Sequence, residues 1–385
     1  MALMACTGDE ELVMPQDNEI ELSATMSATP YNEAETRGIT RAWTAPVGYV
    51  PYDNLYEGSF ENIKSLAESP IDIFLTHDAK EGFTTPTPLH ARLRYSPAPP
   101  PSDSKWKLVL PNTVKEEDMM AGTYYAYGFI PRDAAADAAI EKLSPESPDS
   151  YSDGVKLTIN GMKTVAHDAC VIIGANDGPD ADNDGGLRAG DFSFDLKIGG
   201  GKNYLYFLFD HLCSALIINM KVNGEYNALR HIKLKKIFLE TATAEGPMKE
   251  KAKVTVTLAA NGTGANPIQS VTYTPTGDAV NGDYVFTSKD GVQLPAVPAE
   301  KKFLTHFIPK DVTQLILTST YDVYDTKNNL IREGCKATNT IPLSLIDRFD
   351  EAKRGNKYIL NMTINPTYLY VLSEPDLDNP TVVVE

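Results

Sequence analysis

Short segments in which apolar and polar residues alternate run along most of the chain, and they predict β-strands. In residues 192–198, four apolar side chains stand at every second position with polar ones between them, as in a strand with one buried face. Further strand signals lie at 105–110, 155–159, 232–239, 252–258, 271–274, 284–287, 303–308, 315–324, 330–338 and 358–364. Segment 122–130 is rich in aromatic residues, and 204–209 and 215–222 are longer apolar runs. Gly, Pro and Asn between them indicate turns. Because helices do not alternate with these strands, the pattern predicts an all-β protein built from antiparallel β-sandwiches.

Helical patterns are few, and glycine-rich stretches divide the chain. The Ala-rich segment 133–143 and the segment 345–354 favour helix. The glycines at 199–201 follow the acidic, glycine-containing stretch 177–190, and such stretches commonly separate folded units. We therefore predict two domains in tandem, 42–200 and 201–372, with a C-terminal tail at 373–385.

Composition narrows the classes of function. The chain has 385 residues, 42% of them hydrophobic, and a net charge of −17. This apolar content is enough to form hydrophobic cores, which argues against a mainly disordered chain. Nucleic acids and anionic membrane surfaces attract Lys and Arg, so the negative charge disfavours both as partners.

The N-terminus resembles the end of a bacterial lipoprotein signal. Leu3, Met4 and Ala5 precede Cys6, and an acidic run follows. Residues 1–6 are interpreted as a partial signal with Cys6 as the lipid-bearing residue, which would tie the precursor to a membrane through that lipid alone. Residues 7–41 are polar apart from a short apolar piece at 20–22, and this pattern predicts a leader outside the core. A chance cysteine in a flexible N-terminus is the alternative.

Motifs for catalysis are missing from the sequence. There is no GxSxG, HExxH or P-loop, so we expect a protein that is not an enzyme. His167 with Cys170, and His211 with Cys213, offer four ligands for zinc. Structural zinc sites usually show tighter ligand pairs, so we expect two separate pairs packed on different strands, and no required cofactor.

One acidic loop has the spacing of a calcium site. Asp180, Asp182, Asp184 and Asp191 stand at positions 1, 3, 5 and 12, with glycine at position 6. Alternate oxygen ligands can surround one ion, and glycine permits the bend between them. Position 12 is Asp rather than the usual Glu, and no helices are expected on either side. The sequence therefore predicts weak calcium binding at most, with a solvated acidic loop as the alternative.

Three stretches together resemble one family. The first is the leader, with Cys6 at one end and Arg37 and Arg41 at the other; the others are 204–218 (YLYFLFDHLCSALII) and 354–367 (RGNKYILNMTINPT). Their order is similar to that of the fimbrillins, the structural subunits of type V pili. The resemblance implies two transthyretin-like β-sandwich domains and export as an outer-membrane lipoprotein. It also implies trimming by an Arg-specific protease, polymerisation with other fimbrial subunits by strand exchange, and a role in adhesion at the cell surface.

Within that family, two segments take specific roles. We expect trimming after Arg41, which small Ala42 follows, with Arg37 as the alternative site. If residues 20–26 fill a groove in the precursor, this cut would open it for a strand from another subunit. The C-terminal region supplies the candidate donor strand, for which the apolar residues are Tyr368, Tyr370, Leu372, Val382, Val383 and Val384. The alternative is that 367–372 completes its own domain and the tail frays.

Other functions stay open. Within the same fimbria the chain could be a tip adhesin or an anchor instead of a shaft subunit. A surface lipoprotein that binds glycans would also be acidic and rich in β-structure, but it needs exposed aromatic platforms, and Trp43 and Trp106 are the only tryptophans. A secreted hydrolase would need paired carboxylates at a suitable separation.

Overall fold

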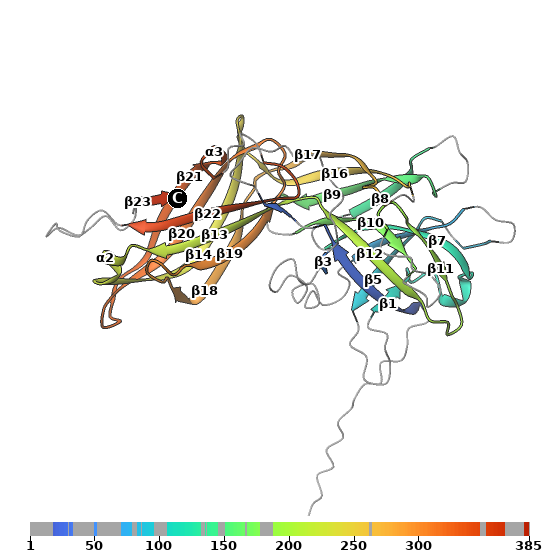
Figure 1. Ribbon diagram of the computed structural model, residues 1–385, viewed down its shortest axis with the longest axis horizontal. Helices are drawn as coiled ribbons and strands as arrows, with labels where there is room; N and C mark the ends of the chain where they lie inside the picture. Colours follow the sequence, from blue (N-terminus) through green and yellow to red (C-terminus); the bar gives the residue numbers. More distant parts are fainter. Residues whose placement is uncertain are drawn as a thin grey trace, which may run out of the picture.

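The fold is built almost entirely of β-strands (Figure 1). The computed structural model describes residues 18–29, 31–33, 50–51, 71–78, 83–85, 87–95, 106–131, 135, 137–144, 151–165, 168–177, 188–261, 264–346, 352–365 and 381–384. In these ranges the helical elements are short: η2 (Glu116–Asp118), α2 (Gly224–Asn227) and α3 (Leu343–Ile346). None of the described helices has the length and apolar character needed to cross a membrane. The all-β prediction is confirmed.

The strands are numbered in chain order. The first twelve are β1 (Glu19–Ala28), β2 (Asn32–Glu33), β3 (Val50–Pro51), β4 (Ile71–Thr76), β5 (Leu89–Tyr95), β6 (Trp106–Val109), β7 (Gly122–Ile130), β8 (Asp137–Lys142), β9 (Gly154–Lys163), β10 (Cys170–Asn176), β11 (Ser193–Leu196) and β12 (Tyr204–His211). The others are β13 (Ser214–Val222), β14 (Arg230–Thr243), β15 (Gly246–Pro247), β16 (Lys249–Ala259), β17 (Ile268–Val280), β18 (Asp283–Gln293), β19 (Lys301–Phe307), β20 (Val312–Asp325), β21 (Leu330–Pro342), β22 (Asn356–Asn365) and β23 (Thr381–Val384).

A nine-stranded sheet lies on the right in Figure 1. Its order is β10-β12-β1-β6-β5-β4-β7-β11, with β3 paired to β1. Strand β7 also pairs with β10, through Ile130 and Cys170. The path from β10 through β1 to β7 therefore returns to β10, and the sheet closes on itself like a barrel.

The remaining described strands form three smaller sheets. Their orders are β19-β13-β22-β2 with β23 on β22, β15-β14-β20-β21 with β18 on β14, and β17-β16-β9-β8. Buried residues from all four sheets belong to one continuous apolar cluster, for example Ile73, Leu157, Leu216 and Leu234. The four sheets thus share one core.

Two details of the secondary structure differ from the expectations. Segment 133–143 is not helical where it is described: 137–142 forms β8, in which Ala138 and Ile140 are buried and their neighbours exposed. Pairing with β9 and burial of one face outweigh the helix propensity of alanine there. The predicted sheets were antiparallel, but β1 with β12, β13 with β22, and β2 with β22 are parallel pairs. For 345–354, α3 ends at Ile346, and 347–351 lie outside the described residues.

Strand pairing crosses residue 200, where the sequence suggested a limit between domains. Strand β12 follows this residue and pairs with β10 and β1, and β16 pairs with β9. The first pairing completes the closed sheet, and the second joins segments about one hundred residues apart in the chain into one sheet. The domain limits at 42, 200 and 372 stay a prediction.

Two buried tyrosines provide a matched test of hydrogen bonding in this core. The Tyr127 hydroxyl donates to the Tyr151 carbonyl at 2.5 Å, whereas the Tyr226 hydroxyl is buried with no hydrogen-bond partner among the described residues. We expect Tyr127→Phe to lower the free energy of unfolding by about 1 kcal/mol and Tyr226→Phe to leave it unchanged or raise it. Denaturant unfolding of the two variants checks this; an equal loss in both would contradict it.

Candidate functional site

The leader contributes a strand to the middle of the closed sheet. Strand β1 lies between β12 and β6, drawn in dark blue in the lower right of Figure 1. Residues 23–28 pair in parallel with 204–209 of β12, and 19–22 pair antiparallel with 106–109 of β6. In the described sheet order β1 is the strand that joins β12 to β6, so the ring depends on it.

The inward face of β1 is part of the core. Ile20, Leu22, Met26 and Ala28 are 2%, 3%, 8% and 0% exposed and belong to the main apolar cluster. Burying each of the three large side chains stabilises the fold by about 1.5–3 kcal/mol. The prediction that residues 7–41 lie outside the core is therefore wrong for 19–28. The sequence does contain a signal for this strand, because apolar residues stand at every second position from 20 to 28. The signal is weak because the residues at 24 and 28 are alanines.

A buried carboxylate fixes the first residue of β1. The Glu19 side chain is 4% exposed and makes ion pairs with Arg94 of β5 and with Lys107 of β6, whose Nζ lies 2.8 Å away. Two cations compensate one desolvated carboxylate, the arrangement that a buried charge requires. This pairing holds the start of β1 against its neighbours.

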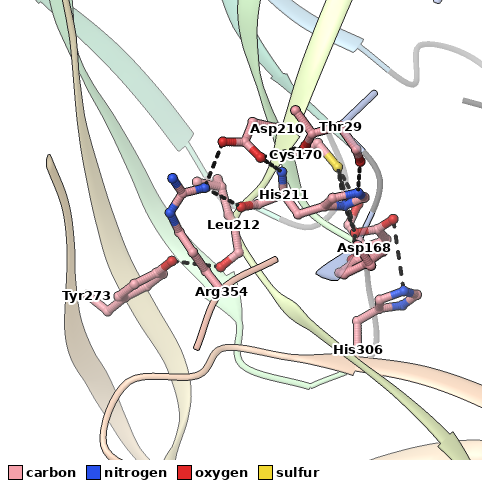
Figure 2. A network of polar contacts seen from close by, with 10 residues as sticks. Thr29, Asp168, Cys170, Asp210, His211, Leu212, Tyr273, His306 and Arg354 are labelled. Atoms are coloured by element: carbon pink, nitrogen blue, oxygen red, sulfur yellow. Dashed lines mark hydrogen bonds and ion pairs between the residues drawn. The ribbon is translucent and has the colours of Figure 1, made fainter. Parts of the chain in front are cut away.

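The other end of β1 leads into a buried polar network (Figure 2). The Thr29 hydroxyl donates to Asp210 Oδ1 at 2.6 Å, and the Thr29 carbonyl lies 2.9 Å from His211 Nε2. The Tyr31 hydroxyl donates to Asp168 Oδ1 at 2.5 Å, and its ring stacks on His211 with centroids 3.6 Å apart. Leader residues thus supply hydrogen bonds to two buried carboxylates.

Asp210 connects the leader to the other half of the molecule. Its Oδ2 lies 2.9 Å from Nη1 of Arg354, which stands two residues before β22, and the same nitrogen donates to the His211 carbonyl at 2.9 Å. Asn266 donates to the same carboxylate oxygen at 3.1 Å. Burial by itself would raise the pKa of Asp210, but Arg354 and the Thr29 hydroxyl hold it below its usual value.

The second carboxylate lies between two histidines. Asp168 Oδ1 is 2.9 Å from His211 Nδ1, and Oδ2 is 3.9 Å from His306 Nε2 of β19; Figure 2 shows Asp168 between the two rings. Burial opposes the charge of Asp168, but His211, His306 and the Tyr31 hydroxyl hold its pKa well below the usual range. Both ring nitrogens of His211 thus lie within hydrogen-bond distance of an oxygen, Nδ1 beside Asp168 and Nε2 beside the Thr29 carbonyl.

Cys170 completes the cluster. Its Sγ lies 3.2 Å from His211 Nδ1, because Cys170 and His211 are paired residues on adjacent strands. Burial, with the charge of Asp168, raises the pKa of the thiol well above its ordinary value. The sequence suggested separate pairs, His167 with Cys170 and His211 with Cys213. The structure brings Cys170 and His211 together, and His167 lies outside the described residues.

Most of the predicted site residues fall in parts of the chain that the structure does not describe. These are Cys6, Arg37, Arg41, Trp43, Asp180, Asp182, Asp184, Tyr368, Tyr370 and Leu372. Asp191 is described, and its Oδ1 accepts hydrogen bonds from the Ser193 amide at 3.1 Å and hydroxyl at 2.7 Å. Lipidation, trimming and calcium binding stay predictions.

The structure does describe the valines of the predicted donor strand and one of the two tryptophans. Val382, Val383 and Val384 lie in β23, which pairs antiparallel with 362–365 of β22. Leader strand β2 pairs with the other end of β22, at 356–357. Trp106, one of the two tryptophans a glycan platform would use, is 3% exposed and supplies no platform.

Thr29, Asp168, Asp210 and Arg354 were not anticipated from the sequence. The hydrogen bonds of Asp210 to Thr29 and to Arg354 span 181 and 144 residues, so no local spacing marks them. One indirect signal was present, because Asp210, His211 and Arg354 all lie in the two stretches that carried the family resemblance.

Comparison with known proteins gives distant likenesses. A candidate cell adhesion protein from Bacteroides uniformis matches with 12% identity over 96% of this chain and 98% of that one, at a TM-score of 0.37. A fimbrial protein from Bacteroides vulgatus matches with 13% identity over 85% and 94%, at a TM-score of 0.31. The fimbrial anchor protein Mfa2 from Porphyromonas gingivalis matches with 10% identity over 94% and 95%, at a TM-score of 0.24. No protein-family model matches the sequence, and no curated protein matches it. At these identities and TM-scores the likenesses assign this chain neither a family nor a function.

Proposed function

We propose that the chain is the precursor of a structural subunit of a bacterial surface fimbria of the type V pilus kind. In this proposal it is exported as an outer-membrane lipoprotein through Cys6, trimmed after Arg41 or Arg37, and polymerised by strand exchange. The observation that carries the proposal is the position of β1: a strand that precedes both arginines in the chain closes the largest sheet. A segment that trimming would separate is therefore part of the core.

Removal of β1 would destabilise the rest of the molecule in water in two ways. The inward positions of Ile20, Leu22 and Met26 would become a void in the core, and β6 and β12 would each expose a row of unpaired backbone groups. A strand from another subunit with apolar side chains at alternate positions would fill the void and pair with the backbone groups of β6 and β12. Polymerisation follows trimming in this scheme because the groove exists only after the leader has left.

The C-terminal tail is the proposed donor. In the precursor, β23 pairs with β22 through four residue pairs, 381–384 with 362–365, at the edge of its sheet. A strand held by so few pairs on one side is easier to detach than one inside a sheet. Its three consecutive valines have high β propensity, which suits insertion into a groove flanked by two strands.

The experiment combines trimming with deletion of the tail. The full chain, treated with an Arg-specific protease, is expected to form ladders that resist dissociation on a gel, whereas the untreated chain stays monomeric. A variant with both Arg37→Ala and Arg41→Ala should keep the leader and stay monomeric after the same treatment. Deletion of 373–385 should leave a folded, normally trimmed monomer.

Two outcomes would contradict the proposal. Ladders from the untrimmed double variant would show that assembly does not need removal of the leader. Ladders from the trimmed, tail-deleted chain would place the donor strand elsewhere. Arg230→Ala, in an exposed residue far from the leader in the chain, is the matched control and should trim and assemble normally.

A further inference from the structure

We propose that Asp168, Cys170 and His211 bind one transition-metal ion, with zinc as the ion they suit best. The three ligand atoms, Oδ1, Sγ and Nδ1, all lie within 4.8 Å of one another. Cys170 is the first residue of β10, Asp168 stands two residues before it, and His211 is the last residue of the neighbouring strand β12. The inference does not depend on the proposed function.

The distances within the cluster fit a single ion. Nδ1 is 2.9 Å from Oδ1 and 3.2 Å from Sγ, and Sγ is 3.6 Å from Oδ1. Ligand atoms that lie about 2.0–2.3 Å from one zinc ion stand about 3–4 Å apart in a tetrahedral arrangement. An ion slightly out of the plane of these three atoms would reach all of them with only small movements of the side chains.

A buried oxygen without a hydrogen bond gives the second, independent observation. The Asp168 side chain is 8% exposed, and its Oδ2 has no hydrogen-bond partner in the described part of the chain; His306 Nε2 lies 3.9 Å from it, beyond hydrogen-bond distance. A buried carboxylate oxygen in this state is costly unless a cation compensates it. A bound metal ion would supply that charge directly to the carboxylate.

The surroundings of His211 are those of a metal ligand. Its Nε2 faces the Thr29 carbonyl at 2.9 Å, so a proton on Nε2 leaves the lone pair of Nδ1 directed at Cys170 and Asp168. Metal-bound histidines commonly donate their other N–H to a carbonyl or carboxylate, which fixes the tautomer and orients the ring. The Tyr31 hydroxyl on Asp168 Oδ1 orients the second ligand in the same way.

The chemistry of the ligands selects the ion. One thiol, one imidazole and one carboxylate suit zinc and its neighbours in the transition series, whereas calcium and magnesium prefer oxygen alone. Binding requires a thiolate and a free lone pair on Nδ1, so the ion displaces the proton of the Cys170 thiol. The positive charge of the ion offsets the burial that otherwise keeps the thiol protonated.

Cobalt(II) is the probe, because it occupies zinc sites and reports its ligands by absorption. Added to the metal-free full chain at neutral pH, it is expected to give a thiolate-to-cobalt charge-transfer band and intense tetrahedral d–d bands that saturate at one equivalent. One equivalent of zinc should abolish both. Cys170→Ser should remove the charge-transfer band, and Asp168→Asn should weaken cobalt binding by at least about tenfold.

Cys213→Ser is the matched control, because Cys213 is also a buried free cysteine but lies outside the cluster; it should keep both bands. Absence of these bands from the intact protein would overturn the proposal, as would their loss in Cys213→Ser to the same extent as in Cys170→Ser. Circular dichroism shows whether each variant folds. If Cys170→Ser does not fold, the intact protein, Asp168→Asn and Cys213→Ser still decide the question.

Discussion

Replacing Asp210 with alanine is expected to lower the free energy of unfolding by about 3–5 kcal/mol, because it leaves a largely buried cation without its partner. Arg354 and Asp210 are 29% and 7% exposed. The variant also removes the acceptor of the Thr29 hydroxyl, so the leader loses one of its attachments. Denaturant unfolding of the full chain, monitored by tyrosine fluorescence, measures the loss.

Two further variants show whether the loss in the free energy of unfolding comes from the ion pair or from shortening the side chain. Asp210→Ala combined with Arg354→Met should recover part of the loss, since no isolated buried charge remains. Asp283→Ala removes the partner of Lys163 in a solvent-accessible pair with an N–O distance of 3.6 Å, and should cost at most about 1 kcal/mol. A loss below about 1 kcal/mol for Asp210→Ala would show that the pair contributes little.

Truncating Leu22 in the leader is expected to cost about 2–5 kcal/mol, as for other fully buried leucines. Leu22 is 3% exposed and pairs with Trp106 of β6 across the junction that closes the ring. The defect should be local as well as global, because β1 has neighbours on both sides. Thermal unfolding measures the loss of overall stability, and amide hydrogen exchange in 106–109 and 204–209 measures the local effect on β6 and β12.

The control for this prediction is the adjacent residue. Glu21 is exposed, and Glu21→Ala should change stability by no more than about 0.5 kcal/mol. Equal effects at positions 21 and 22 would mean that the leader does not pack with one face inward. Unchanged exchange in β6 and β12 after Leu22→Ala would mean that β1 does not hold the ring closed.

The strands could be predicted because a half-buried strand has a local signature. In β16, for example, buried Ala252, Val254, Val256 and Leu258 alternate with more exposed residues, and this period of two is visible in one chain without its partners. The same pattern in 137–142 was interpreted as helix because alanine favours helices. Pairing with β9, which the sequence does not display, decided that segment.

The role of the leader was harder to predict. Its alternation is carried partly by Ala24 and Ala28, which bury little area, and its acidic residues suggested solvent. Glu19 is nevertheless buried, because Arg94 and Lys107 from two other strands meet it. A carboxylate can be buried at little cost when cations from other strands form ion pairs with it, and only the tertiary structure shows that they do.

The sequence by itself determined that the chain is a β protein with several half-buried strands, since each strand carries its own periodicity. The direction of β1 beside β12, the closure of the ring through β7 and β10, and the network around Asp168 and Asp210 were decided by the tertiary structure alone. The reason is physical: backbone pairing and buried charge compensation depend on which segments meet. The partners lie 40 residues apart or more, and the partners of Asp210 lie 181 and 144 residues away.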